Sequence, residues 1–500
     1  MQTINAPVLG DFATVLDLFD AVVRHHGDRE AFVHLAQRLS FAEWAARADA
    51  LAGWLIDTHG VRKGDIVGIK LPSSIDYMVA YQAIMRAGAI ATGINPRLGP
   101  SELAHIDKIA APTFTFDGAL PVLPDGDPVR RRIELVETDP VAIVWTGGTT
   151  GLPKGAWFDH GCLRAMTLGA APISAPGDRR LSPLPFAHVG AMTRVWDELQ
   201  HVITTVIVPA PWTAEAALQL IDDERITVSQ GVPTQYRMMF DHPDFASTDV
   251  SSLRIAGVGA ARVPPELVTE MRAKLGCPVV VRYASTESCL ATGCRADDSV
   301  EVICNTVGRP NGDVELKLVD EHRTVITATG ADHVGTVCLR SRAMMRGYWN
   351  DPERTADAID RAGWMHTGDL AVMDEDGYVN IVGRIKDMVI RGGENVYPRE
   401  IEEFLYTHPE IEDVQVIGVP DERYGEELMA WVKLREGAQL TEEDVRTYCR
   451  GRIAHFKIPR YVKFVDSFPM TVTGKVRKVE MREISIAELG LETAAATETA

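Results

Sequence analysis

Short apolar runs rich in β-branched residues alternate with helix-like patterns through the middle of the chain. The strand-like runs, which all fall between Val141 and Glu287, are VAIVW, TTVIVP, ITVSQ, RIAGVG and PVVVRY. One helix is expected near 213–223, and another begins at the proline pair 264–265 and ends at Gly276. Proline suits the first turn of a helix and glycine suits its C-terminal cap. Strands that alternate with helices predict parallel βαβ units and an α/β fold.

The pattern changes after Gly383. A helix-like stretch near 398–407 precedes two strand-like runs, VQVIGV and MAWVKL, and a final strand is expected at YVKFV. Between them, Thr441 with Asp444 three residues later predicts a capping box at the start of a helix. These elements indicate a separate α+β domain of about 100 residues. The low-complexity end, ELGLETAAATETA, is expected to fray.

Composition and charge restrict the classes of function. Five hundred residues, of which 46% are hydrophobic and 24% charged, exceed one compact core, so we expect several domains. The formal net charge of -19 would repel a polyphosphate backbone, which argues against general nucleic-acid binding. The seven scattered cysteines lack the spacing of zinc sites, which favours reduced thiols in the cytoplasm.

No targeting or membrane segment is predicted. The N-terminal residues MQTINAPVLGDF contain neither a basic segment nor an apolar run, so they do not resemble a secretory signal. The most apolar stretch, 78–94, is interrupted by Gln82 and Arg86 and is too short and too polar to span a bilayer. We expect a cytoplasmic protein without a membrane span.

A loop rich in glycine and threonine directly follows the strand VAIVW. Its candidate phosphate-binding residues are Thr146, Gly147, Gly148, Thr149, Thr150, Gly151 and Lys154. Glycines let backbone N–H groups approach an anion, the threonine hydroxyls add donors, and the lysine adds positive charge. The segment is not a Walker A loop, because Pro153 and Gly155 flank the lysine. It nevertheless predicts a cradle for phosphates.

The segment TGGTTGLPKG resembles the phosphate-binding signature of the adenylate-forming superfamily, which includes acyl-CoA ligases, luciferases and adenylation domains. Other segments match the family in order and spacing: LPSSIDYMVAYQAIMRAGAIATGINP, PLPFAH, RYASTES, MMRGYWNDPERT, GWMHTGD, GRIKDMVIRGGENVYPREIE and PMTVTGKVRK. They cover nearly the whole chain, and GGENVYPREIE resembles the acyl-CoA synthetase branch. The resemblance implies an ATP-dependent, AMP-forming ligase that joins a small carboxylic acid to coenzyme A with Mg²⁺.

The resemblance also implies a domain plan. Residues 1–385 would form a large domain of parallel sheets with flanking helices and a small β subdomain. Residues 386–485 would form a mobile α+β lid that is hinged at Lys386, and 486–500 a disordered tail. The resemblance leaves a homodimer open.

Individual roles follow by position within the matched segments. At the nucleotide, the resemblance assigns Tyr283 to stack on adenine, Thr286 to contact phosphate and Glu287 to bind magnesium. A hard cation that bridges phosphates prefers a carboxylate oxygen, which agrees with Glu287. Asp369 would accept hydrogen bonds from the ribose hydroxyls, and Arg384 would reach the same nucleotide.

The lid would contribute Lys475, which resembles the lysine that bridges the substrate carboxylate and the α-phosphate. An ammonium group there would neutralise the repulsion between two anions as they react. Gly392 and Gly393 would line the route of the CoA thiol in the other lid orientation. With Thr286, Glu287 and His188, Lys475 completes the set of candidate catalytic residues.

The acyl pocket is expected between His188 and a set of small residues. His188 matches the histidine or aromatic position at the mouth of the pocket; a purely structural histidine is the alternative. The small residues are Gly257, Gly259, Ala260, Ala261 and Ala284. They leave room for a bulky acid, or they merely permit tight strand packing. Aromatic, alicyclic, fatty and polycyclic acids all remain open.

Two departures from the family pattern concern the first half-reaction. The family usually has Ser or Thr at the position of Gly147, and Gly at that of Ala284. Loss of the hydroxyl would weaken adenylation by about 1–3 kcal/mol if no other donor replaces it. Alternatives to full ligation are therefore an enzyme that mainly thioesterifies a supplied acyl-adenylate and a non-catalytic nucleotide sensor. Transfer to a carrier protein and luciferase-like oxidation are rivals within the superfamily.

Overall fold

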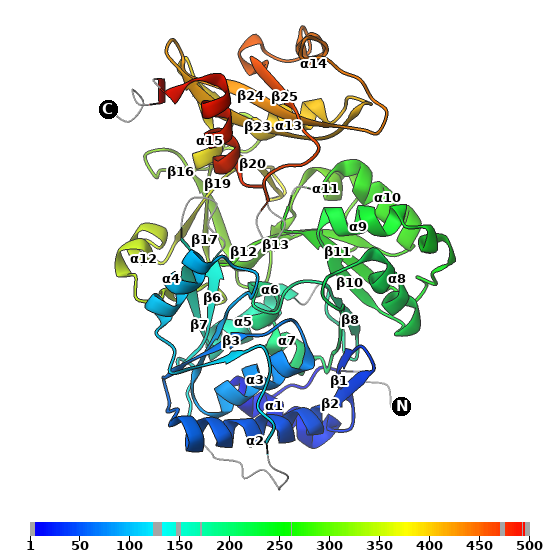
Figure 1. Cartoon of the computed structure of the whole chain (residues 1–500), viewed down its shortest axis with the longest axis vertical. Coiled ribbons are helices and arrows are strands. Elements are labelled where there is room, and N and C mark those ends of the chain that lie inside the picture. Colours follow the sequence, from blue (N-terminus) through cyan, green and yellow to red (C-terminus); the bar gives the residue numbers. More distant parts are fainter. Residues whose placement is uncertain are drawn as a thin grey trace.

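The computed structural model describes residues 6–123, 133–146, 152–170, 173–261, 263–470, 476–492 and 494–495. Three sheets and their helices form the larger part of the molecule, and the C-terminal elements form a smaller body at one end (Figure 1). This arrangement confirms the α/β fold class with a separate α+β domain. Among the described helices, none has a stretch long and apolar enough to cross a membrane.

The largest sheet has nine strands in the order β14-β13-β12-β11-β10-β8-β9-β1-β2. Its strands are β1 Glu30–His34, β2 Gln37–Ser40, β8 Arg179–Ser182, β9 Thr204–Ile207, β10 Val228–Gly231, β11 Ile255–Gly259, β12 Val279–Ser285, β13 Cys289–Gly293 and β14 Arg309–Pro310. In this spatial order, the neighbouring strands β12, β11, β10, β8, β9 and β1 pair in parallel, as the alternating pattern predicts. The carboxyl ends of β10, β11 and β12 therefore lie at one edge, where ligands bind in open α/β sheets.

A second sheet has six strands in the order β18-β7-β6-β4-β3-β5. Its strands are β3 Ile66–Lys70, β4 Ile90–Gly93, β5 Phe114–Asp117, β6 Pro140–Thr146, β7 Lys154–Asp159 and β18 Gly347–Tyr348. The helix α3 (Ile75–Arg86) contacts β1 of the first sheet and both β3 and β4 of the second. Every α3 residue except Asp76 is buried, because the helix lies between two sheets.

The remaining helices of the larger part cover these two sheets. They are α1 Val15–His26, α2 Phe41–His59, α4 Pro100–Ala110, α5 His160–Ala170, α6 Val189–Met192, α7 Val195–Gln200, α8 Ala214–Asp223, α9 Pro233–Asp241, η1 Pro243–Ser247, α10 Pro265–Leu275, α11 Val300–Asn305 and α12 Pro352–Ala358. Gly276 caps α10 with a left-handed φ of 66°, a conformation that favours glycine. The helices expected near 213–223 and 265–275 are thus confirmed.

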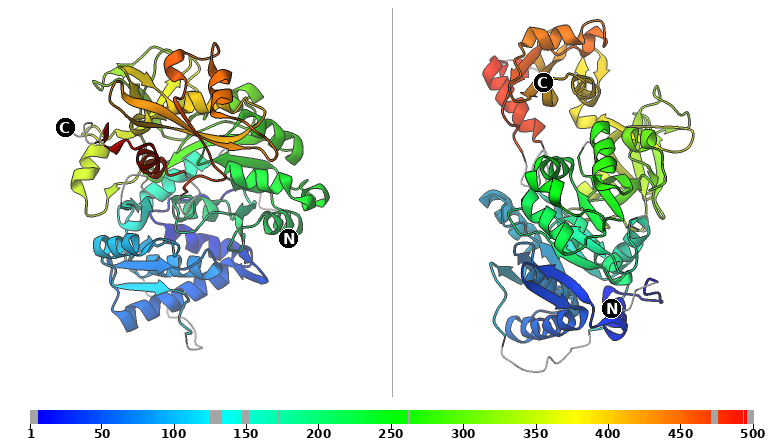
Figure 2. Two further views of the ribbon diagram at one scale, coloured as in Figure 1. Left: turned by 45° about the horizontal axis from the view of Figure 1, so that its top comes forward. Right: turned by 90° about the vertical axis from the view of Figure 1, so that its right-hand side faces the viewer.

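A third, antiparallel sheet forms a small β subdomain with the order β16-β15-β17-β19-β20. Its strands are β15 Glu315–Val319, β16 Val325–Ile326, β17 Gly335–Arg340, β19 Met365–Met373 and β20 Val379–Arg384. The chain leaves β20 at Arg384 and enters the C-terminal body through the short helix η2 (Ile385–Asp387). Figure 2 shows this body standing apart from the two large sheets.

The C-terminal body packs around its own apolar core. Its elements are β21 Val389–Arg391, β22 Glu394–Val396, α13 Pro398–Leu405, β23 Ile411–Asp421, β24 Gly425–Leu434, α14 Glu442–Cys449, η3 His455–Lys457, β25 Tyr461–Phe464 and α15 Lys478–Leu489. The capping box at α14 is confirmed, since Asp444 N donates to Thr441 Oγ1 at 3.2 Å and Thr441 N to Asp444 Oδ2 at 2.8 Å.

The predicted start of the disordered tail, residue 486, is wrong. The helix α15 continues to Leu489, and Gly490 ends it with a φ of 65°. Leu489 and Leu491 pack against an apolar cluster that includes Trp431 and Met481. Partial burial of these leucines orders the chain beyond the point where low complexity suggested fraying. Residues 493 and 496–500 lie outside the described part.

Candidate active site

At the nucleoside end, three of the predicted residues meet. Asp369 of β19 and Arg384 of β20 are register partners, and Arg384 Nε lies 2.8 Å from Asp369 Oδ1. The Tyr283 hydroxyl, at the end of β12, donates to Asp369 Oδ2. Burial, together with the charge of Asp369 and this hydrogen bond, raises the pKa of Tyr283 well above its usual value. Tyr283 therefore remains a neutral donor at physiological pH.

The local backbone fixes the Asp369 carboxylate. Asp369 is only 4% exposed, and its N–H donates to Thr367 Oγ1 at 3.0 Å. The Thr367 hydroxyl in turn donates to the Val337 carbonyl of the neighbouring strand at 2.9 Å. A buried, anchored carboxylate beside an aromatic ring and a guanidinium has the chemistry to bind a ribose and its base.

At the phosphate end, Thr146 of β6 and Lys154 of β7 are register partners at the base of the glycine-rich loop. Lys154 Nζ donates to the Tyr348 hydroxyl at 2.8 Å, and that hydroxyl donates to Glu287 Oε1, also at 2.8 Å. Gly147, Gly148, Thr149, Thr150 and Gly151 lie outside the described residues. The lysine of the loop and Glu287 are thus joined through one phenol group.

Tyr348 is the site residue that the sequence reasoning missed. It lies within the matched segment MMRGYWNDPERT, but nothing in that run indicates its partners. Antiparallel pairing of β18 with β7 places Tyr348 opposite Ala156, next to the strand that carries Lys154. Burial raises the pKa of Tyr348 well above its usual value, and Glu287 adds to the shift.

The Glu287 carboxylate has one oxygen that can bind a magnesium ion. Its Oε1 accepts from Tyr348, whereas no residue of the described ranges donates to Oε2. No group of three or more acidic, His or Cys side chains among the described residues could hold a metal by itself. A Mg²⁺ ion at Glu287 would therefore take its other ligands from phosphate oxygens and water. The neighbouring Thr286 hydroxyl has no hydrogen-bond partner among the described residues either.

The acyl-pocket candidates lie on the edge of the nine-stranded sheet and on α6. His188 is the N-cap of α6, and its Nδ1 accepts from Gly190 N at 3.4 Å. Ala260, Ala261 and Ala284 are exposed, and Ala260 has a left-handed φ of 63°. The small side chains at this edge thus leave the pocket mouth open.

The two glycines of β11 differ in what they permit. A Cβ on Gly259 would lie 2.6 Å from the backbone carbonyl oxygen of Arg282, so only glycine fits there. A Cβ on Gly257 would lie 3.4 Å from both Gln230 Nε2 and Ile173 Cδ1, which is ordinary contact. Tight strand packing explains Gly259, whereas Gly257 leaves space above the side chain of Gln230.

In the C-terminal body, Gly392 and Gly393 form the two-residue turn between β21 and β22. Their φ angles are 60° and 91°, a combination that favours glycine at both positions. Both are exposed, and no hydrogen bond between described residues joins them to Asp369 or Glu287. Lys386 lies in η2 between the two bodies. Lys475 lies outside the described residues; the adjoining Val476 pairs with Met470.

Comparisons with known proteins show the family of the chain. The AMP-binding enzyme model matches residues 19–133 and 117–349, and the model of the AMP-binding enzyme C-terminal domain matches residues 400–475. The mitochondrial medium-chain acyl-CoA ligase ACSF2 of Bos taurus is 32% identical over 94% of this chain and 87% of its own.

Solved structures share the fold over nearly the full length. The crystal structure of ATP-bound MatB from Rhodopseudomonas palustris matches with a TM-score of 0.84 and 29% identity, covering 94% of this chain and 99% of MatB. The amide bond synthetase McbA from Marinactinospora thermotolerans matches with a TM-score of 0.83 and 26% identity, over 94% and 99% of the two chains. The chain therefore belongs to the AMP-binding enzyme family and is an ATP-dependent, AMP-forming acyl-CoA ligase.

Proposed function

We propose that the chain joins a small carboxylic acid to the thiol of coenzyme A in two half-reactions at one site, with Mg²⁺ at Glu287. The observation that carries the proposal is the placement of Tyr283 and Glu287 on one short segment. Tyr283 contacts the Asp369 carboxylate, and Glu287 contacts Tyr348. Tyr283, which belongs to the nucleoside-binding group, and Glu287, which belongs to the phosphate-binding group, are thus only four positions apart in the chain. One bound ATP requires the two groups to lie close together in this way.

In the first half-reaction, a carboxylate oxygen of the acid attacks the α-phosphorus of ATP. The bond between the α-phosphorus and the bridging oxygen breaks, and pyrophosphate leaves with that electron pair. Lys154 and the glycine-rich loop hold the departing phosphates, and Lys475 neutralises the two approaching anions. A magnesium ion would offset further phosphate charge.

In the second half-reaction, the CoA thiol attacks the acyl carbonyl and AMP leaves. The thiol loses its proton as the thioester forms, and the adenylate phosphate is a far better leaving group than hydroxide. We assign the reorientation between the two steps to rotation of the C-terminal body about Lys386. The Gly392–Gly393 turn has no side chains to obstruct a narrow pantetheine route, which supports its assignment to the second step.

The acyl acceptor is the point that an experiment must decide. The test incubates the protein with ATP, Mg²⁺ and a broad acid panel, in parallel reactions with CoA, with a carrier protein bearing a pantetheine thiol, or with an amine. Mass spectrometry identifies the acyl product, and AMP and pyrophosphate are quantified. We expect CoA esters with equimolar AMP. Carrier-bound or amide products in the absence of CoA ester would overturn the choice of acceptor.

The magnesium assignment has its own test. Glu287→Gln keeps the shape of the side chain and removes the charge, so the Mg²⁺ concentration that gives half-maximal pyrophosphate release should rise about 10-fold or more. Thioester formation from a supplied acyl-adenylate, which involves no pyrophosphate, should change far less. The homodimer and the cytoplasmic location stay predictions.

A further inference from the structure

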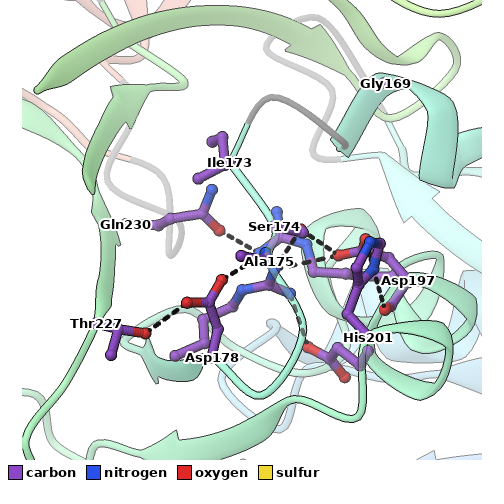
Figure 3. Close-up of polar contacts among 12 residues, drawn as sticks. Gly169, Ile173, Ser174, Ala175, Asp178, Asp197, His201, Thr227 and Gln230 are labelled. Carbon is purple, nitrogen blue, oxygen red and sulfur yellow. Dashed lines mark hydrogen bonds and ion pairs between the residues drawn. The ribbon is translucent and has the colours of Figure 1, made fainter. Parts of the chain in front are cut away.

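Figure 3 shows a network of polar contacts that includes Ser174, Asp178, Asp197, His201 and Gln230. Within it, Arg180 Nη2 donates to Ser174 Oγ at 2.7 Å and to Asp197 Oδ2 at 3.1 Å. Arg180 Nη1 lies 3.5 Å from Glu198 Oε1, and His201 Nδ1 lies 3.1 Å from Asp197 Oδ1. Asp197 and Glu198 are therefore both paired with Arg180.

Arg194 belongs to this network, and the charges of Glu198 and Asp197 act on it without a direct ion pair. Its Nη1 donates to the neutral Gln230 Oε1, and its Nε is buried without a hydrogen bond to any described residue. It forms no ion pair within the described part of the chain. Arg282 likewise donates to a neutral group, the Gly169 carbonyl. Arg180, Arg194 and Arg282 thus share the carboxylates of Asp197 and Glu198, because the third acid of the network, Asp178, pairs with Arg254.

Burial makes this surplus of positive charge costly. It lowers the pKa of Arg194 to about 10, with repulsion from Arg180 adding to the shift. It lowers the pKa of Arg282 to about 9, with repulsion from Arg194 adding. Both groups keep their charge at neutral pH, and a partly buried cation without a direct ion pair favours an incoming anion or carbonyl oxygen.

Arg194 and Gln230 lie at the inner side of the predicted acyl pocket. Gln230 of β10 is the register partner of Gly257 on β11, so both face the same side of the sheet. No side chain on Gly257 covers Gln230, whose Nε2 lies 3.4 Å from the position of a Cβ there. Arg194 also lines one small cavity together with Arg180, Glu198 and the residues Gly190 and Ala191, which closely follow His188.

His188 and Arg194 come from successive turns of the chain. Arg194 follows His188 by six positions, through the short helix α6 and the turn that precedes α7. A group bound at Arg194 would therefore lie apart from the carboxylate that reacts near His188.

We propose that Arg194 and Gln230 bind a second oxygen acceptor at the far end of the acid, so that the substrate is a dicarboxylic or distally oxo-substituted acid rather than a plain fatty acid. This inference rests on the proposed CoA ligase function and specifies its substrate class. A distal carboxylate would form a direct ion pair with Arg194, and a distal carbonyl would accept from the Arg194 guanidinium and the Gln230 amide.

The test measures kcat/KM for CoA-ester formation with dicarboxylates of six to ten carbons, with the matching ω-1 oxo acids, and with monocarboxylates of equal length. For the best length, we expect the wild type to prefer a distally oxygenated acid by about 10- to 100-fold. Arg194→Met should abolish this preference. Arg194→Lys, which keeps the charge but not the planar fork, should retain part of it with the dicarboxylate.

Arg254→Met is the matched control. Arg254 pairs with Asp178 at 2.7 Å and donates to the Ile173 carbonyl, so it is an arginine of the same network with an acid of its own. Its replacement should leave the preference ratio unchanged even if the variant is less stable. If Arg254→Met and Arg194→Met lower the ratio equally, Arg194 has a structural role and the proposal is wrong.

The outcomes separate this inference from the proposed function. Rapid CoA-ester formation from monocarboxylates, with no preference for any distally oxygenated acid, would overturn the substrate class and leave the ligase function intact. If no acid yields a CoA ester, the thermal unfolding midpoint in the presence of AMP and each dicarboxylate decides. A stabilisation seen in the wild type and lost in Arg194→Met supports the site; equal midpoints overturn it.

Discussion

Tyr348 and Glu287, 61 positions apart in the sequence, are joined by a hydrogen bond of 2.8 Å from the phenol to Oε1. The same phenol accepts from Lys154 Nζ at 2.8 Å. One neutral hydroxyl therefore links a cation and an anion that form no direct ion pair with each other. Because the pair is kept apart, Lys154 and Glu287 each keep charge available for a ligand, the first for phosphate and the second for a metal ion.

Tyr348→Phe tests this arrangement. Without the hydroxyl, Lys154 and Glu287 lose their common partner, so kcat/KM for ATP-dependent pyrophosphate release should fall about tenfold. The Mg²⁺ concentration that gives half-maximal pyrophosphate release should change at the same time. Tyr378→Phe is a matched control, since Tyr378 donates to Asp298 at 2.7 Å outside the candidate site. Equal losses in both variants would contradict the role of Tyr348.

Lys475→Ala should separate the two half-reactions. Loss of the ammonium group should slow adenylation at least about 10²-fold, the scale for one preorganised transition-state contact. Thioester formation from a synthetic acyl-adenylate should survive, because no second anion has to approach the phosphate in that step. A parallel loss of both half-reactions would show that Lys475 does not belong to one lid orientation.

Lys386→Pro tests the hinge. Proline fixes φ near -65° and should hold the C-terminal body in one orientation, so that acyl-adenylate accumulates without conversion to the CoA ester. Lys386→Ala removes the same charge without restricting φ, and should retain most of the turnover. Unimpaired overall turnover by the proline variant would falsify the hinge assignment.

Gly147→Ser tests whether the first half-reaction is weakened in this chain. If no other donor replaces the missing hydroxyl, the variant should release pyrophosphate about 10-fold faster or more, with unchanged thiol transfer from a supplied adenylate. Fast release by the wild type that the serine does not improve would exclude a ligase biased towards the second step. The assay compares both proteins with the same acid.

Gly259→Ala should destabilise the fold, whereas Gly257→Ala should do so far less. A Cβ on Gly259 would meet the Arg282 carbonyl at 2.6 Å, and overpacking of this kind costs about 1–3 kcal/mol. A Cβ on Gly257 would make 3.4 Å contacts and intrude on the acyl pocket instead. Chemical denaturation measures the first effect, and the acid panel detects the second. Equal free energies of unfolding for the two variants would refute the distinction.

Patterns along the chain predict most of the fold because they depend on local chemistry. The α10 helix is an example, since Pro265 and Gly276 set its ends through backbone geometry alone. The extent of α15 could not be predicted in the same way. The ordering of Leu489 depends on apolar partners such as Ile417 and Trp431, which belong to distant strands.

The residues of the candidate site likewise include some that the sequence predicts and some that it does not. Tyr283, Asp369 and Arg384 could be selected from matched segments, and the structure brings these three together. Tyr348 and Arg194 could not, because each gains its meaning from a partner more than 30 residues away, Glu287 and Gln230 respectively. A tyrosine or arginine viewed in isolation resembles an ordinary structural residue.

The register of β19 with β20 has a thermodynamic consequence. Arg384 is paired with Asp369 and stands two positions before Lys386, the expected pivot of the C-terminal body. A rotation that starts at Lys386 and displaces Arg384 would alter the affinity for whatever nucleotide Asp369 binds. Reciprocity then requires the nucleotide to bias the rotation by the same free energy. A change of the bound nucleotide from ATP to AMP beside Asp369 and Arg384 would therefore shift the equilibrium between the two orientations of the C-terminal body.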